Sequence, residues 1–102
     1  MRTSVVVTYT LKPEAYEEHV GLIRRVFEQL AAETPETVDY QVMRLEDGVS
    51  FVHVSTADTP DGANPLGTLS AFQEFNRTVG ERVATPPKPV PATVIGEYHG
   101  LS

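Results

Sequence analysis

Hydrophobic and polar positions repeat with two different periods along the chain, and their order predicts the elements β-α-β-β-α-β. An alternating pattern predicts four strands, at residues 4–11, 38–45, 49–56 and about 92–99. Apolar residues spaced by three and four predict two helices, one from Pro13 to Thr34 and one after Pro65. The residues Ala57 to Asn64 are rich in turn formers and predict a loop before the second helix.

The second and third strands are joined by Glu46-Asp47-Gly48-Val49, which predicts a tight hairpin. Asp-Gly between alternating apolar residues favours a type I′ turn, which needs positive φ at both central positions. A two-residue turn here pairs Val42 with His53, Arg44 with Phe51 and Tyr40 with Ser55. His53 then shares one face of the sheet with Tyr40, Val42, Arg44 and Phe51.

The first helix presents an apolar stripe that we expect to pack on the sheet, formed by Tyr16, Val20, Ile23, Phe27 and Leu30. His19 lies at the margin of that stripe and is expected to be half exposed. The second helix carries Leu69, Phe72, Val79 and Val83 on one face, with Asn64 as its N-cap and Pro65 at its first position. The proline-rich residues 85–91 are expected to be extended and to lead into an edge strand.

This element order favours an α+β ferredoxin-like fold in a single domain spanning residues 1–102. We expect a four-stranded antiparallel sheet of order 4-1-3-2 with both helices on one face. Helices cover only that face, yet the strands offer apolar residues on both faces, as Phe51 against Val52 and Val54 illustrates. A sheet that is apolar on both sides needs a second cover, so we predict a homodimer.

Composition excludes several classes of function. The net charge of −6 disfavours a nucleic acid or an anionic membrane as partner, since both need clustered Lys and Arg. The chain has no cysteine, which excludes disulfides, thiolate metal sites and cysteine nucleophiles. Its three histidines show no metal-ligand spacing, so no metal site is expected. The residues after Met1 do not resemble a signal peptide, and a cytoplasmic location is the simplest expectation.

Two polar residues stand where the pattern calls for apolar ones. Asn76 falls within the apolar face of the second helix, where it is either a structural amide or a group that orients a ligand carbonyl or hydroxyl. His53 lies in the middle of a strand, where it is a core histidine, a dimer-interface group or a pocket base. Tyr9 and Tyr40 are further candidates, because a tyrosine on a strand can donate a hydrogen bond to a ligand.

The element order, and the stretch from Phe51 to Phe75 in particular, resembles the dimeric α+β barrel superfamily, and within it the antibiotic biosynthesis monooxygenase-like proteins. The resemblance implies a small-molecule pocket between sheet and helices. It also implies a cofactor-free oxygenase activity on aromatic, polyketide-like substrates.

The same resemblance suggests His53 as the catalytic base and Asn76 as the orienting group. Phe72, Phe51, Tyr9 and Tyr40 would complete the ligand site. Phe72 stands where haem-binding relatives would carry a histidine, and no cofactor is expected. The alternative is a non-catalytic dimeric module that binds a ligand or a partner.

Overall fold

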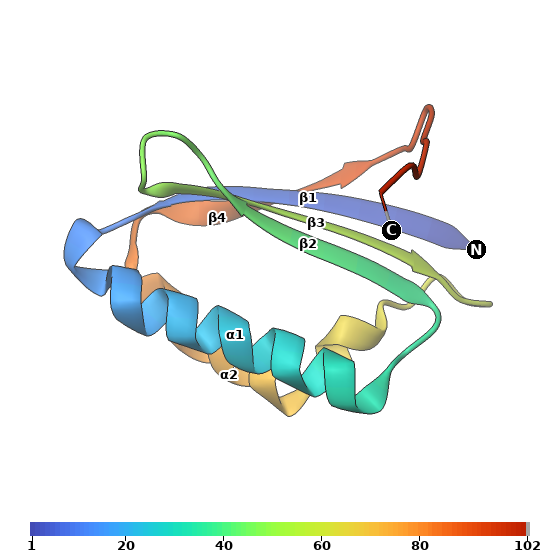
Figure 1. Cartoon of the computed structure of the whole chain (residues 1–102), viewed down its shortest axis with the longest axis horizontal. Helices are drawn as coiled ribbons and strands as arrows, with labels where there is room; N and C mark the ends of the chain where they lie inside the picture. Colours follow the sequence, from blue (N-terminus) through green and yellow to red (C-terminus); the bar gives the residue numbers. More distant parts are fainter. Residues whose placement is uncertain (102) are drawn as a thin grey trace.

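The computed structural model, which describes residues 1–101, has one antiparallel sheet with two helices packed against one of its faces (Figure 1). The strands are β1 (Arg2–Leu11), β2 (Val38–Arg44), β3 (Ser50–Asp58) and β4 (Val83–Ala92). The helices are α1 (Tyr16–Glu33) and α2 (Ser70–Thr78), with short 3₁₀ turns η1 (Pro13–Ala15), η2 (Pro65–Thr68) and η3 (Val79–Glu81). The strand order β2-β3-β1-β4 is the predicted order read from the other edge, so the ferredoxin-like prediction is confirmed.

The hairpin register is as predicted, although its turn is of a different type. Tyr40 pairs with Ser55, Val42 with His53 and Arg44 with Phe51. In the turn itself only Gly48 has a positive φ, so the type I′ geometry predicted for Asp47-Gly48 is wrong. The Asp47 carboxylate instead accepts hydrogen bonds from the backbone N–H of Val49 and of Ser50, at 3.0 and 2.8 Å. These bonds close a four-residue loop that preserves the same pairing.

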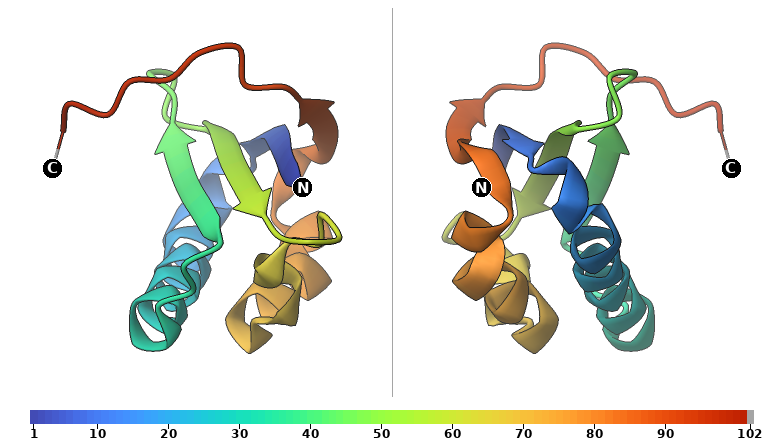
Figure 2. Two further views of the ribbon diagram at one scale, coloured as in Figure 1. Left: turned by 90° about the vertical axis from the view of Figure 1, so that its right-hand side faces the viewer. Right: turned by 90° about the vertical axis from the view of Figure 1, so that its left-hand side faces the viewer.

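The last strand lies earlier than predicted, over Val83–Ala92 instead of about residues 92–99. The proline-rich segment is therefore the strand, and residues 93–101 have no regular structure and extend on the side of the sheet away from the helices (Figure 2). Pro89 and Pro91 pair with Val7 and Val5 and so occupy equivalent positions on the ladder, whereas Pro87 falls where the register shifts. Because β4 is an edge strand, the missing N–H groups of Pro89 and Pro91 can face away from β1 without loss of a hydrogen bond.

Most residues of the two predicted apolar stripes pack against the core, but the most deeply buried position of each helix lies to one side of its stripe. In α1 the buried residues are His19, Leu22 and Val26, so the expectation of a half-exposed His19 is wrong. α2 ends at Thr78, and its buried residue is Phe75, while Asn76 is exposed. The predicted stripe of α2 assumed a helix continuing to Val83, and that residue instead begins β4. The Asn64 cap is present, with its Oδ1 accepting from Leu66 N–H at 3.0 Å, but it caps η2.

The core lies between the helices and one face of the sheet. It contains aromatic and aliphatic side chains from all four strands and both helices. Along β3, Phe51, His53, Ser55 and Ala57 are buried, whereas the residues between them are partly exposed. Within residues 1–101 no helix is long and apolar enough to cross a membrane.

Candidate functional site

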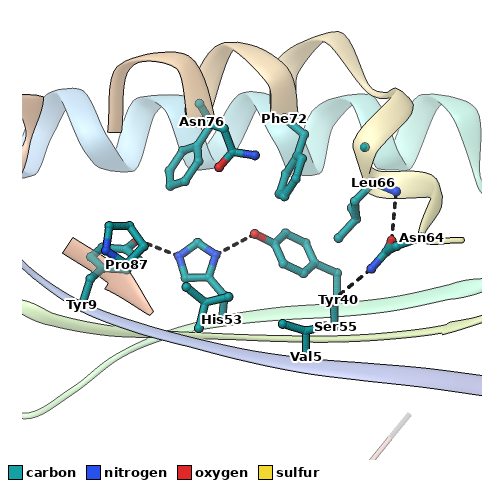
Figure 3. Close-up of a pocket in the computed structure, with 13 residues that line it drawn as sticks. Val5, Tyr9, Tyr40, His53, Ser55, Asn64, Leu66, Phe72, Asn76 and Pro87 are labelled. Atoms are coloured by element: carbon teal, nitrogen blue, oxygen red, sulfur yellow. Dashed lines mark hydrogen bonds between the residues drawn. The ribbon is translucent and has the colours of Figure 1, made fainter. Parts of the chain in front are cut away.

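A cavity of about 280 Å³ lies between the sheet and α2, and it gathers most of the predicted site residues (Figure 3). Its walls are mainly apolar. Tyr9, Tyr40 and His53 line it from the strands, Phe72 and Asn76 from α2, and Leu66 from η2. Its volume is near the lower end of what small-molecule sites offer, and an apolar lining with a few convergent polar groups is typical of them.

His53 is held from both sides by tyrosine hydroxyls. Its Nε2 lies 2.6 Å from the Tyr9 hydroxyl, and its Nδ1 lies 2.7 Å from the Tyr40 hydroxyl (Figure 3). The side chains come from three adjacent strands, β1, β2 and β3, and Val42 and Val7 are the direct neighbours of His53 in the pairing. Because alternate residues of a strand share a face, the register fixed by the hairpin brings these three side chains together.

The hydrogen-bonded chain continues beyond Tyr9 into the core. The Tyr9 hydroxyl also lies 2.5 Å from His19 Nε2, on α1. His19 Nδ1 in turn accepts a hydrogen bond of 3.0 Å from Nε of Arg82, which precedes β4. Five polar side chains thus form one continuous path from the core to the cavity, in the order Arg82, His19, Tyr9, His53, Tyr40.

Arg82 is a buried cation, with only 2% of its surface exposed. Its guanidinium donates to the Phe75 carbonyl at 3.1 Å and to the Thr78 hydroxyl, and it stacks over the Phe75 ring at 5.1 Å. Among residues 1–101 no carboxylate lies within 4.0 Å of it. Burial lowers the pKa of Arg82, yet an arginine stays protonated in proteins, so a fixed positive charge sits at the inner end of the path.

Burial controls the protonation of the other members of the path. It lowers the pKa of His53 to about 4. Burial, assisted by the nearby charge of Arg82, also lowers the pKa of His19 to about 4. The pKa of the Tyr9 and Tyr40 hydroxyls is raised, mainly by burial. At neutral pH both imidazoles are therefore neutral and both tyrosines keep their protons.

The two predicted residues of α2 lie at the cavity, but not as buried groups. Asn76 is exposed, so the interpretation of a buried amide in an apolar stripe is wrong. Its amide nevertheless lines the cavity and extends from α2 toward the sheet (Figure 3). The Phe72 ring lies beside it and meets the Tyr40 ring edge-on, with centroids 6.1 Å apart.

Phe51 lies behind the cavity and does not line it. It is 3% exposed and stacks on the Tyr9 ring, with centroids 5.6 Å apart and planes 5° from parallel. Its ring also meets that of His19 edge-on at 5.0 Å. Phe51 thus supports the position of Tyr9 and His19 instead of contacting a ligand directly.

Sequence reasoning missed His19 and Arg82 as members of the site. The spacing of His19, Leu22 and Val26 by three and four residues is helical and could have placed His19 on the buried face. Nothing local marks Arg82, which is brought to His19 across 63 positions of sequence. No group of three residues suited to holding a metal ion occurs within residues 1–101.

No protein-family model matches the chain, and no curated protein matches it in sequence. Solved structures do match its fold. One is Rv0793 from Mycobacterium tuberculosis, with a TM-score of 0.78 at 15% identity over 97% of this chain and 100% of that one. Another is named antibiotic biosynthesis monooxygenase, with a TM-score of 0.75 at 15% identity over 94% of this chain and 100% of that one.

A third match is a variant of SnoaB, a cofactor-independent oxygenase from Streptomyces nogalater. Its TM-score is 0.70 at 15% identity, over 94% of this chain and 95% of that one. Identities this low establish the fold and not the activity. The chain therefore has the ferredoxin-like α+β fold of the antibiotic biosynthesis monooxygenase-like structures, as its sequence resemblance predicted.

Proposed function

We propose that the protein is a small-molecule enzyme that promotes the reaction of a hydroxylated aromatic substrate with O₂, without a cofactor. The observation that carries this proposal is the largely apolar cavity of about 280 Å³ that the hydrogen-bonded side chains of Tyr40 and His53 line. Aromatic walls such as Phe72 suit a planar ring. The Tyr40 hydroxyl, which is bonded to His53, offers a polar group for the substrate oxygen.

The chemistry needs an electron-rich substrate held away from water. A phenol that has lost its proton can transfer electrons to O₂, which is the oxidant. In the balanced reaction the hydroxyl proton and one ring hydrogen leave, one oxygen atom is added to the ring as a carbonyl, and the other oxygen atom leaves in water. The neutral residues of the cavity supply binding and orientation, and the resemblance to cofactor-independent oxygenases supports this class of reaction.

Asn76 keeps the orienting role that the sequence suggested, whereas His53 acts through a neighbouring tyrosine. His53 governs the protonation of the substrate oxygen through Tyr40, because tyrosine hydroxyls occupy both of its ring nitrogens. Asn76 orients the substrate from α2, on the side of the cavity opposite the sheet (Figure 3).

The test uses 1-naphthol as substrate and measures O₂ uptake together with formation of 1,4-naphthoquinone. The wild-type protein should exceed the autoxidation rate in buffer, and His53→Ala and Asn76→Leu should reduce that excess. Arg77→Met is the matched control, since Arg77 is exposed and paired with Glu74 on the surface of α2. Turnover that is unchanged in both site variants would show that the site assignment is wrong.

A non-catalytic ligand-binding module is the second candidate. The observation in its favour is that both nitrogens of His53 already have partners, which leaves no free imidazole in the cavity. Binding of 1-naphthol measured by calorimetry, with no O₂ uptake above buffer, would support this candidate over the enzyme.

We further expect a homodimer, because the face of the sheet away from the helices presents apolar side chains such as Val52 and Val54, which are only partly buried.

A further inference from the structure

The direction of every hydrogen bond in the path from Arg82 to Tyr40 follows from the donor at its inner end. A guanidinium can only donate, so His19 Nδ1 must be an acceptor without a proton. A neutral imidazole carries one N–H, so the proton of His19 is on Nε2 and points to the Tyr9 oxygen. Tyr9 accepts that bond and has one proton of its own left to donate.

The same reasoning extends to the cavity. The Tyr9 proton is donated to His53 Nε2, which leaves the His53 proton on Nδ1. His53 Nδ1–H therefore donates to the Tyr40 oxygen. The proton of the Tyr40 hydroxyl has no acceptor among residues 1–101, and Tyr40 lines the cavity.

We propose that Arg82 fixes the direction of the hydrogen bonds along this path, so that Tyr40 presents a hydrogen-bond donor to the cavity. The site then selects ligands that place an oxygen acceptor there. This inference rests on the proposed small-molecule function and names the chemistry of its ligand: an aromatic ketone, or a phenol in its ionised form. Both have an acceptor oxygen that needs no proton from the protein.

Reversing the direction of these hydrogen bonds would require His19 to carry its proton on Nδ1, where it would point at the Nε–H of Arg82. The buried position of Arg82 and its bonds to the Phe75 carbonyl and the Thr78 hydroxyl keep it in place. Under this polarity His53 stabilises negative charge on a ligand oxygen through Tyr40, as an oxyanion site does. It does not act as the base that the sequence suggested.

The polarity can be measured without any ligand. Long-range ¹H–¹⁵N correlation spectra of histidine-labelled protein at pH 7.5 report which ring nitrogen carries the proton. We expect Nε2–H for His19 and Nδ1–H for His53, the form less common for histidine in water, with the exposed His99 as internal reference. His53 with its proton on Nε2 would overturn the proposal.

Arg82→Met and Arg77→Met form a matched pair, because each removes one arginine charge and only Arg82 donates to His19. Arg82→Met should give His53 a mixture of the two tautomers, whereas Arg77→Met should keep the wild-type spectrum. An unchanged His53 tautomer in folded Arg82→Met would contradict control by Arg82. If Arg82→Met does not fold, the wild-type spectrum decides the polarity alone.

Ligand selection is tested with 1-tetralone and tetralin, which have nearly the same shape and differ by one carbonyl oxygen. A neutral hydrogen bond from Tyr40 should make 1-tetralone bind about two- to tenfold more tightly than tetralin. The preference should disappear in Tyr40→Phe. A wild-type ratio of one or less, or a ratio that Tyr40→Phe leaves unchanged, would refute the selection.

The ionised form of a ligand is tested with 4-nitrophenol, whose anion absorbs visible light. Tighter binding of the anion should lower the apparent pKa of the bound dye in the wild-type protein, and this shift should be absent in Tyr40→Phe. A raised apparent pKa of the bound dye in the wild-type protein would exclude the phenolate as ligand. Failure of all three probes to bind would contradict the proposed function itself, while the tautomers would still report on the polarity of the chain.

Discussion

The two faces of the sheet reverse the usual relation between polarity and burial. The face toward the helices is buried, yet it contains Tyr9 and His53 and contacts His19 and Arg82. The face away from the helices is partly exposed, yet valines such as Val6, Val52 and Val54 occupy it. Burial of polar groups is tolerated only when they are hydrogen-bonded, and within residues 1–101 no buried side-chain nitrogen or oxygen lacks a partner.

This difference indicates where each kind of function resides. The buried polar path leads to a cavity and suits chemistry on a small molecule. The open face carries valines among small polar residues, and we expect it to associate with a second copy of the chain. Changes on one face should therefore leave the property of the other unaltered.

Placing a charge on the open face should have the largest effect. In a homodimer Val54→Glu would bury two carboxylates, one from each copy, and each unpaired buried charge costs several kcal/mol. We expect a dimer for the wild-type protein and a monomer for this variant at micromolar concentration, measured by light scattering. Ala32→Glu, at an exposed position of α1 on the other side of the sheet, is the control for surface charge. A wild-type monomer would contradict the dimer.

Acid should weaken the fold through the buried histidines. The pKa of both His19 and His53 is about 4 in the folded chain, against an ordinary value of 6.5. The unfolded chain then binds more protons between these two values, so stability is complete above pH 6.5 and falls as the pH drops toward 4. At 1.36 kcal/mol per pKa unit, each histidine contributes roughly 3 kcal/mol.

Urea unfolding at pH 7.5, 6.5, 5.5 and 4.8 measures this loss. His53→Gln should reduce the pH dependence by about half, whereas His99→Gln should leave it unchanged because His99 is exposed. A free energy of unfolding that stays constant across this range would show that the two histidines titrate as exposed residues do.

Removing the buried cation should destabilise the fold to a smaller extent. Arg82→Ala leaves a cavity and takes the donor from His19, the Phe75 carbonyl and the Thr78 hydroxyl. The loss should be about 3 kcal/mol, in the range for breaking a buried polar network. Thermal unfolding measures it, with Arg77→Ala expected to change stability by less than about 0.5 kcal/mol. Equal effects of the two variants would contradict the importance of Arg82.

Asn76→Leu should have the smallest effect on stability. Leucine would stabilise the fold if Asn76 lay buried in the apolar face of α2, but Asn76 is exposed. We now expect a change within about 0.5 kcal/mol, as for most surface positions. Chemical denaturation of the variant decides between the two expectations, since a gain of 1 kcal/mol or more would restore the buried interpretation.

The sequence by itself determined the strand order and the pairing of the hairpin. A strand's side chains alternate strictly, and a short loop ties two strands in one register, so the pairing of Val42 with His53 could be predicted even with the wrong turn type. The prolines of residues 85–91 indicated an edge strand for the same local reason. The sequence analysis did not place these prolines within the strand itself, because proline usually ends a strand.

Only the tertiary structure decided which polar residues meet. Helical periodicity identifies a face only approximately, so it predicted too much exposure for His19 and too much burial for Asn76, although Asn76 does line the cavity. The contact between Arg82 and His19 joins residues 63 positions apart, and no local pattern encodes such a distance. That contact also determines the direction of the hydrogen bonds and thereby what Tyr40 offers to a ligand. The chemistry of the site therefore depends on how distant residues pack together, whereas the strand order and hairpin register that support it follow from the local sequence pattern.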